Sequence, residues 1–332
     1  MISIRNVTKS FGTAKAVDDL SLEIGQGELC VLLGPSGCGK STTLRLVNRL
    51  LEPDSGSVLV GGENTSFLPP HELRRRIGYV IQSIGLFPHL SVHDNIATVP
   101  RLLGWPRARI GERVAELLAL VGLPDYFAKR WPRQLSGGEA QRVGVARALA
   151  ADPPVLLMDE PFGALDPLTR VRLQVEFAAL QKRLGTTVLF VTHDVGEALR
   201  LGGTMVLMRG GQIEQLGRPE DFAHQPASAF VSEFLGPEYG LELLGRYPVM
   251  ERLRPLSALS SRGAVDSASA AQSGELSLPR IASTANLKEA LSAMVAGGNL
   301  VALVCDDSGA VLGEISFEDA ACLDKEGEQR CV

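Results

Sequence analysis

The stretch GPSGCGKST at residues 34–42 combines three glycines with one lysine and three hydroxyl side chains. It fits the pattern GxxxxGK[ST], in which backbone N–H groups of a glycine-rich loop and of the following helix point at phosphate groups. Lys40 would neutralise the β- and γ-phosphates of a nucleotide, and the Ser41 hydroxyl would be a ligand of Mg²⁺. The residues expected around these phosphates are Gly34, Pro35, Ser36, Gly37, Cys38, Gly39, Lys40, Ser41 and Thr42.

An acidic pair follows the apolar run VLLM at residues 155–158. Asp159 would support Mg²⁺, and Glu160 would act as general base on the water that attacks a γ-phosphate. A pair of carboxylates at a strand end can instead cap the next element. Together with the phosphate loop, however, this pair favours nucleotide hydrolysis.

A second glycine-rich turn, LSGGE, occupies residues 135–139. Ser136 and Glu139 have the spacing of a capping box at the head of the helical stretch EAQRVGVARALA. Capping does not account for the consecutive Gly137 and Gly138. Two glycines would leave backbone N–H groups exposed at the N-terminal, positive end of the helix. This second anion site contacts either the nucleotide bound by its own chain or the nucleotide bound by another copy of the chain.

The apolar runs CVLLG, VLLMDE and TTVLFVTHD alternate with stretches of helical spacing. Strands of this kind are buried on both faces, which predicts an α/β fold with a parallel sheet flanked by helices. The first run leads through the glycine loop into KSTTLRLVNRLL, whose Leu44, Val47 and Leu51 share one helix face. Residues from about 85 to 150 are predicted to form a helical insertion, and 171–184 a further helix.

The pattern changes after about residue 245. Residues 256–279 hold seven serines and five alanines without an apolar period, so 246–279 is predicted to be a linker. Within 280–325, PRIAS, NLKEALSAMVA, NLVALVC, AVLGEIS and FEDAACL predict a small β-α-β-β-α unit, with DDSG as a hairpin turn. Residues 1–245 then form one catalytic domain, and 280–325 a second, smaller one.

Six motifs, in this order along residues 1–240, resemble those of the ATP-binding subunits of ABC transporters. They are GPSGCGKST, Gln82 in YVIQ, LSGGEAQR, VLLMDEP, Ala164-Leu165-Asp166 and His193 in VTHD. In that family two subunits meet head to tail, and the signature loop of each touches the ATP held by the other. The resemblance therefore implies a homodimer in which Leu135, Ser136, Gly137, Gly138 and Glu139 act on the partner's ATP.

The resemblance also implies roles for single residues. Phe11 matches the aromatic residue that stacks on adenine, although it would also suit an ordinary edge strand. Gln82 matches a residue that senses Mg²⁺ and the attacking water, and His193 matches the switch histidine at the γ-phosphate. Asp166 matches the loop that links the two sites of the dimer. Catalysis would then rest on Glu160, His193 and Gln82, and the metal site on Ser41, Gln82 and Asp159.

Residues 84–105 are similar to a segment of the ATPases of osmoprotectant importers, which carry glycine betaine, choline or carnitine. Such proteins often have a second glutamine where this chain has Ser83, and they commonly end in CBS domains. The 280–325 unit resembles one CBS unit, in which Gly313, Ser316 and Asp319 would contact a nucleotide ligand. The same three residues also suit a turn and a helix cap.

The expected protein is thus an ATP- and Mg²⁺-dependent subunit of an osmoprotectant importer. Its expected partners are a second copy, integral membrane permease subunits and, indirectly, an extracytoplasmic solute-binding protein. It would lie at the cytoplasmic side of the membrane. The alternatives are an importer ATPase for another small solute, such as an amino acid or an anion, and a soluble ABC-type ATPase clamp.

Composition agrees with these expectations. The 332 residues hold 33 basic and 38 acidic side chains, a net charge of −5, which does not suit a nucleic-acid partner. Five cysteines without CxxC spacing indicate free thiols in a reducing compartment. Met1 is not followed by a signal-peptide pattern, and no run of about 18 apolar residues predicts a membrane span.

Overall fold

The computed structural model describes residues 1–82, 85–256 and 278–321. The chain divides into two compact units, Met1–Phe234 and Leu235–Val332. Residues 83–84, 257–277 and 322–325, on which parts of the sequence predictions fall, lie outside the described residues.

The first unit is built around a six-stranded sheet with the order β10-β9-β3-β8-β7-β6. Neighbouring strands from β9 to β6 are parallel, and β10 runs antiparallel to β9. Strands β3, β7 and β8 are buried at every residue, as expected for apolar runs covered on both faces. The predicted α/β fold is confirmed. The strands are β3 (Leu29–Leu33), β6 (Ile77–Val80), β7 (Val155–Asp159), β8 (Thr187–Val191), β9 (Thr204–Arg209) and β10 (Gln212–Gly217).

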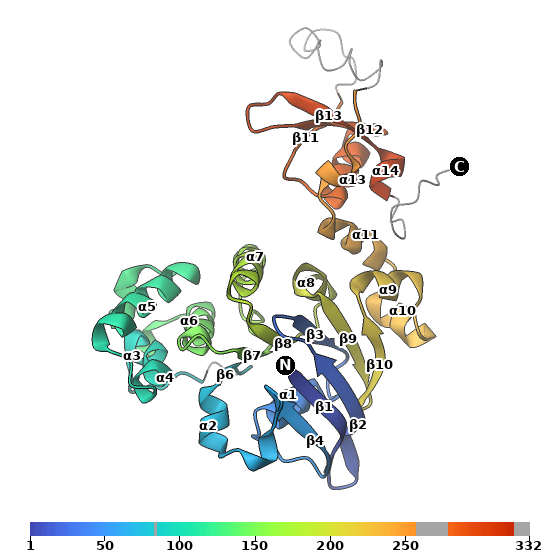
Figure 1. The fold of residues 1–332 in the computed structure, drawn as a ribbon. Coiled ribbons are helices and arrows are strands. Elements are labelled where there is room, and N and C mark those ends of the chain that lie inside the picture. The colour runs from blue at the N-terminus through green and yellow to red at the C-terminus, as the bar shows by residue number, and fades with distance from the viewer. Residues whose placement is uncertain (83–84, 257–277, 322–332) are drawn as a thin grey trace. The chain divides into compact units, whose positions relative to one another are not determined.

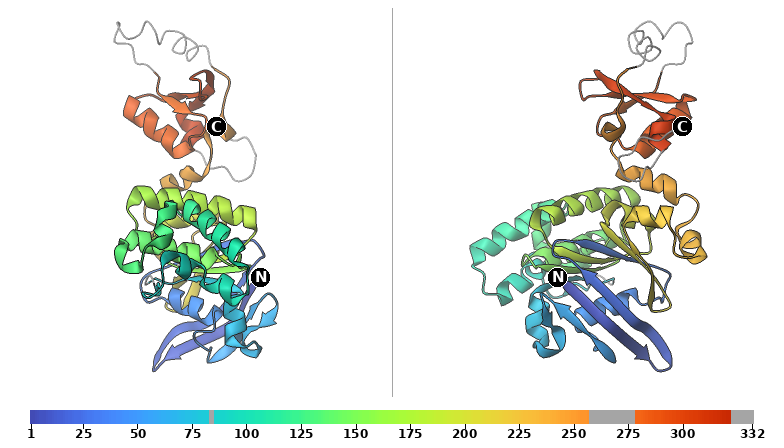
Figure 2. Two further views of the ribbon diagram at one scale, coloured as in Figure 1. Left: turned by 90° about the vertical axis from the view of Figure 1, so that its left-hand side faces the viewer. Right: turned by 45° about the vertical axis from the view of Figure 1, so that its right-hand side comes forward.

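A separate four-stranded antiparallel sheet, with the order β2-β1-β4-β5, forms another layer of the first unit (Figures 1 and 2). Its inward residues, such as Leu20 and Val58, share one core cluster with Leu44 of α1 and Leu32 of β3. Helix α1 is therefore held between two sheets, and the phosphate loop before it is fixed from both sides. The strands are β1 (Ile2–Phe11), β2 (Ala14–Ile24), β4 (Ser55–Val60) and β5 (Glu63–Asn64).

The helices of this unit largely match the predicted stretches, with two differences at their ends. Helix α1 stops at Val47, so Leu51 lies beyond it rather than on its face. Helix α7 begins at Pro167, before the predicted 171, because the side chain of Asp166 caps it and proline suits the first turn. The helices outside the insertion are α1 (Lys40–Val47), α2 (Pro70–Arg75), α7 (Pro167–Leu184), α8 (Val195–Leu201), α9 (Pro219–His224) and α10 (Ala229–Leu235).

The stretch from 85 to 150 is helical, as its spacing predicts, and its helices gather beyond the β6 edge of the sheet (Figure 1). Ile110, Val114 and Leu117 form the buried stripe of the longest of them, α5. The four helices are α3 (Val92–Ile96), α4 (Thr98–Leu102), α5 (Arg107–Leu120) and α6 (Gly137–Leu149), with short 3₁₀ helices at Asp125–Lys129 and Pro132–Gln134. A further 3₁₀ helix, Thr65–Phe67, lies before β6 and outside this stretch.

The second unit has the predicted β-α-β-β-α order. In its sheet, β11 is parallel to β12, and β12 is antiparallel to β13. Leu287, Ala290, Leu291 and Met294 of α13 form the helical side of its core. The elements are α11 (Tyr239–Leu243), β11 (Arg280–Ala282), α13 (Leu287–Gly297), β12 (Val301–Cys305), β13 (Val311–Ser316) and α14 (Phe317–Ala321), with 3₁₀ helices at Leu244–Arg246 and Val249–Arg252.

The prediction of a linker from residue 246 is wrong for 246–256. Val249 is fully buried in the core of the second unit, and its backbone N–H donates to the carbonyl of Ala285. Arg254 exchanges two backbone hydrogen bonds with Glu314, which adds a bridge at the edge of β13. The chain thus enters the second unit at Leu235, ten residues before the predicted domain end.

Across the three described ranges, none of the helices has the length and apolar character needed to cross a membrane.

Candidate nucleotide-binding and hydrolysis site

Four neighbouring strands bring the predicted site residues to one edge of the large sheet. In the order β3-β8-β7-β6 these strands are parallel, so their carboxyl ends meet at the same edge. The glycine loop follows β3, His193 follows β8, Glu160 follows β7, and Gln82 follows β6. The topology therefore collects four sequence-distant motifs into one site.

The loop between β3 and α1 requires glycine at two positions. Gly34 has a φ of 142° and Gly39 a φ of 108°, a region that residues with a Cβ rarely adopt. A Cβ at Gly34 would lie 2.4 Å from the carbonyl oxygen of Met208, and one at Gly39 would lie 2.3 Å from that of Ala16. The backbone of this loop has the close packing expected of a phosphate cradle.

Lys40 opens α1, and its side chain turns back into the loop. It is 7% exposed, and its Nζ donates to the carbonyl oxygens of Gly34 at 2.7 Å and Pro35 at 2.9 Å. A buried ammonium is tolerated only when its donors are satisfied, which these bonds achieve. Nζ also lies 3.7 Å from Sγ of the buried Cys38, whereas Ser36 and Gly37 are exposed at the loop tip. The positive charge thus lies inside the predicted phosphate cradle.

The predicted metal ligand Ser41 lies beside Asp159. The Ser41 hydroxyl donates to Oδ1 of Asp159 at 2.9 Å, and Asp159 is 3% exposed. Burial raises the pKa of Asp159, and the hydrogen bond from Ser41 opposes this rise. A hydroxyl and a carboxylate form the oxygen donor set that Mg²⁺ prefers, so these residues fit that ion.

Glu160, Gln82 and His193 form one hydrogen-bonded group. Gln82 Nε2 donates to Oε2 of Glu160 at 3.3 Å, and Nδ1 of His193 lies 3.1 Å from Oε1. Both carboxylate oxygens of Glu160 are therefore oriented by residues from the neighbouring strands. This arrangement suits a base that must hold one water in a defined place.

The backbone of Glu160 is in a conformation unusual for a residue with a Cβ. Its φ is +47°, which costs roughly 1–2 kcal/mol for a non-glycine residue. Its N–H donates to the carbonyl of Val191 at 3.0 Å, which ties it to the end of β8. Such strain persists when the surroundings determine it, and it occurs most often at functional sites.

The LSGGE turn forms the predicted capping box. The Ser136 hydroxyl accepts from the backbone N–H of Glu139 at 3.3 Å, and Glu139 Oε2 accepts from that of Ser136 at 2.7 Å. Gly138 has a packing reason of its own, because a Cβ there would lie 3.0 Å from the Leu165 side chain. Gly137, in contrast, faces open space. The start of α6 therefore packs against the segment before α7. Leu135 is the first residue of the LSGGE turn.

Asp166 and Phe11 occupy exposed positions in the first unit. Oδ1 of Asp166 accepts from the backbone N–H of Thr169 at 3.0 Å and so caps α7. Phe11, at the end of β1, is 53% exposed, which leaves its ring available for stacking. The remaining loop residue, Thr42, is half-buried in the first turn of α1.

The three candidate ligand residues of the second unit have local bonds. Asp319 Oδ2 accepts from the hydroxyl of Ser316 at 2.6 Å, and its Oδ1 pairs with the Arg254 guanidinium. A Cβ at Gly313 would lie 2.4 Å from the carbonyl oxygen of Arg254. These contacts match the turn-and-cap interpretation of the three residues.

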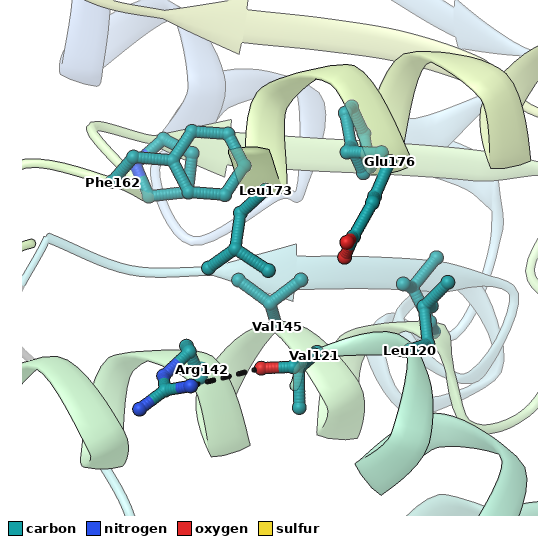
Figure 3. A pocket seen from close by; sticks show the side chains of 10 residues that line it. Leu120, Val121, Arg142, Val145, Phe162, Leu173 and Glu176 are labelled. Atoms are coloured by element: carbon teal, nitrogen blue, oxygen red, sulfur yellow. Dashed lines mark hydrogen bonds between the residues drawn. The ribbon is translucent and has the colours of Figure 1, made fainter. Parts of the chain in front are cut away.

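A small apolar cavity of about 20 Å³ lies between α5, α6 and α7 (Figure 3). At its edge, the Arg142 guanidinium donates to the carbonyl oxygen of Val121 at 3.2 Å. This volume suffices for about one water, whereas ligand sites typically measure about 300–1,000 Å³. The cavity is therefore not a second ligand site.

Comparison with known proteins identifies the family. Residues 17–163 match the family model described as ABC transporter. Over 320 residues the chain is 49% identical to the glycine betaine uptake system ATP-binding protein YehX of Escherichia coli, covering 96% of this chain and 98% of that protein. The chain belongs to the ATP-binding proteins of ABC transporters. It is accordingly an ATPase subunit that powers transport.

Other similar proteins share this ABC ATPase unit. The choline transport ATP-binding protein OpuBA of Bacillus subtilis is 52% identical over 239 residues, which cover 72% of this chain and 63% of that protein. The dimeric ABC transporter cassette MJ0796 is 36% identical with a TM-score of 0.62, covering 66% of this chain and 98% of the cassette. A dimeric post-hydrolysis state of the same cassette, with ADP and Pi bound, has a TM-score of 0.61 at 35% identity and covers the same shares of the two chains.

A buried polar group of this ABC ATPase has no signal in the sequence. Glu197 of α8 is 5% exposed, and its Oε1 accepts from Gln174 Nε2 at 2.8 Å. Gln174, fully buried on α7, accepts in turn from Nε of Arg200 at 2.8 Å. Polar residues on helices suggest solvent-facing positions, so only the packing of α7 against α8 reveals this group.

We expect Glu197→Gln to raise the Tm at about pH 8 but not at about pH 4. Burial raises the pKa of Glu197 above its ordinary value of 4.5, so the ionised side chain costs stability in the folded state. The cost is absent below that ordinary value and grows as the pH rises through the folded-state pKa. Glutamine keeps the bond from Gln174 without a charge. Thermal unfolding at both pH values measures the difference.

The matched control for this change is Glu112→Gln on the exposed surface of α5. The control should leave the Tm nearly unchanged at both pH values. An equal Tm shift for Glu197→Gln at pH 4 and pH 8 would contradict the stated cause, because the gain would then not depend on ionisation.

Proposed function

We propose that this ABC ATPase powers the uptake of an osmoprotectant such as glycine betaine, choline or carnitine. The observation that carries the proposal is the full-length similarity to the glycine betaine system ATPase YehX, which includes the second unit as well as the first. The choline relative OpuBA and the carnitine relative OpuCA of Listeria monocytogenes, at 52% and 49% identity, support the same cargo class.

The proposed chemistry is hydrolysis of the γ-phosphate of ATP. Glu160 accepts a proton from water, the water oxygen bonds to the γ-phosphorus, and the bond from that phosphorus to the bridging oxygen of ADP breaks. Gln82 and His193 support this role through their contacts with the Glu160 carboxylate. Mg²⁺, when held by Ser41, Gln82 and Asp159, would supply positive charge that stabilises the phosphate oxygens.

The ATP site is proposed to be completed by a second copy of the chain. Lys40 and the glycine loop hold the phosphates, Phe11 stacks on adenine, and Ser136 and Gly138 of the partner subunit face the γ-phosphate. The dimeric state of the similar cassettes supports this arrangement. In this dimer, Asp166 lies in the loop that links the two sites.

A cavity of about 290 Å³ between the sheet edge and the helical insertion is the proposed docking place for a permease subunit. Arg74, Arg75 and Arg147 give it positive charge, and Phe87 gives it an apolar wall. Tyr79 also lines it, only three residues before Gln82, so a docked segment would lie near the hydrolysis site. The chain would therefore lie at the cytoplasmic side of the membrane, and an extracytoplasmic solute-binding protein would deliver the cargo.

The second unit is proposed to be a CBS-like regulatory module. Its β-α-β-β-α order supports this. Ser316 and Asp319 share a hydrogen bond at the junction of β13 and α14, and Gly313 lies three residues earlier in β13. Since these residues already have partners within the unit, a nucleotide ligand would have to displace the Arg254 ion pair.

Uptake of labelled solutes at high osmolarity tests the proposed cargo. Cells with the matching permease would carry either the unaltered chain or Glu160→Gln, and labelled glycine betaine, choline and carnitine would be supplied separately. We expect the variant to lose uptake of at least one of the three. Unchanged uptake of all three would overturn the osmoprotectant assignment, and the same cells would then be tested with amino acids and anions.

A further inference from the structure

One buried side chain connects the LSGGE helix to the catalytic glutamate. Gln141 of α6 is 5% exposed. Its Nε2 donates to the backbone carbonyl oxygen of Glu160 at 3.0 Å, and its Oε1 accepts from the backbone N–H of Ala164 at 3.0 Å. A single amide therefore bridges both ends of the turn that follows β7.

This turn determines where the Glu160 carboxylate lies. The Glu160 carbonyl also accepts from the N–H of Gly163 at 3.2 Å, so the turn closes on itself. The left-handed φ of Glu160 needs fixed surroundings on both sides. The backbone N–H of Glu160 is fixed by its bond to the Val191 carbonyl, and the backbone carbonyl of Glu160 is fixed by the bond from Gln141.

Helix α6 is also connected to other parts of the proposed machinery. Gly138, three residues before Gln141 and thus on the same helix face, lies against Leu165. Near the other end of α6, Nη1 of Arg147 donates to the carbonyl oxygen of Gly85 at 2.7 Å beside the proposed permease cavity. A shift of this helix at either end would move the amide that holds Glu160.

We propose that Gln141 is a positioning residue that makes the placement of the catalytic base depend on the position of the LSGGE helix. The inference rests on the proposed function, in which Glu160 is the base and LSGGE contacts the partner's ATP. Gln141 touches neither ATP nor water in this role. It transmits the position of α6 to the Glu160 backbone through its two hydrogen bonds.

The test compares Gln141→Leu with Gln181→Leu. Gln181 on α7 is equally buried, and its Nε2 donates to the carbonyls of Gly27 at 2.8 Å and Thr186 at 2.7 Å, remote in sequence from the catalytic turn. Both variants lose the two hydrogen bonds of a buried side chain, so both should lower the Tm. Only Gln141→Leu should lower kcat, on the order of 10- to 100-fold, with the KM for ATP unchanged. An equal loss of kcat in both variants, or a change in KM alone, would overturn the proposal.

Two further variants keep the test decisive. If Gln141→Leu does not fold, Gln141→Asn keeps the amide but shortens it by one methylene, so it cannot reach both backbone groups. It should lower kcat more than Gln181→Asn does, and parity between them would overturn the proposal. Glu160→Gln is measured alongside: turnover that survives this change would refute Glu160 as the base, whatever the Gln141 variants show.

Discussion

Replacing Glu160 by glutamine is expected to abolish ATP turnover while ATP binding is retained. Glutamine has the same shape, so contacts with Gln82 and His193 can persist, but it cannot accept a proton from water. Loss of a general base typically lowers the rate about 10²- to 10⁴-fold. The glycine loop, Lys40 and Ser41 are untouched, so the Kd for ATP should stay near that of the unaltered chain.

Phosphate release and equilibrium binding of labelled ATP measure these two effects separately. Glu112→Gln, which makes the same change on the exposed surface of α5, is the control and should retain full turnover. Sizeable hydrolysis by Glu160→Gln would show that another group takes the proton. Loss of binding would show instead that the carboxylate helps to hold the nucleotide.

Replacing Lys40 by methionine is expected to weaken ATP binding about 10- to 100-fold. A hydrogen bond from a charged donor contributes about 1.5–3 kcal/mol, which corresponds to this range of Kd. The carbonyls of Gly34 and Pro35 orient the Lys40 ammonium in the loop. Methionine has no donor with which to replace the hydrogen bond from this ammonium to a phosphate. Methionine keeps most of the buried volume.

Equilibrium binding to labelled ATP measures this effect, with Lys15→Met as the control. Lys15 pairs with Asp18, and its side chain is 57% exposed. The control should leave the Kd nearly unchanged. An unaltered Kd for Lys40→Met would mean that the backbone of the loop alone carries the phosphate affinity.

The sequence predicts those features that depend on short, continuous stretches. The glycine loop, the Ser136–Glu139 capping box and the buried strands that follow helical segments all depend on neighbours within a few residues. The elements of the second unit from β11 to α14 also follow from local periodicity and from the DDSG turn. Glu160 is predicted from the acidic pair after a buried strand, Gln82 and His193 are predicted from the family resemblance, and the parallel strand order explains why the three meet.

Features that depend on contacts between distant segments could not be predicted in this way. Gln141 has the same local pattern as any polar helix residue, and only the packing of α6 against the turn after β7 reveals its two backbone bonds. The antiparallel sheet of β1, β2, β4 and β5 required a pairing that the separate strand patterns do not specify. Val249 and Arg254 lie just before a serine-rich stretch, and their segment is too short to show a period.

The core of the second unit is assembled from two stretches of chain, 235–256 and 278–321. A shortened protein that ends near residue 250 would therefore keep Tyr247 and Val249 but lose the apolar residues of 278–321 against which they pack. Such a product exposes apolar side chains and is expected to aggregate. A loss of its activity would therefore not show what the second unit does. A cut next to Leu235 would instead keep both stretches of this core in one fragment.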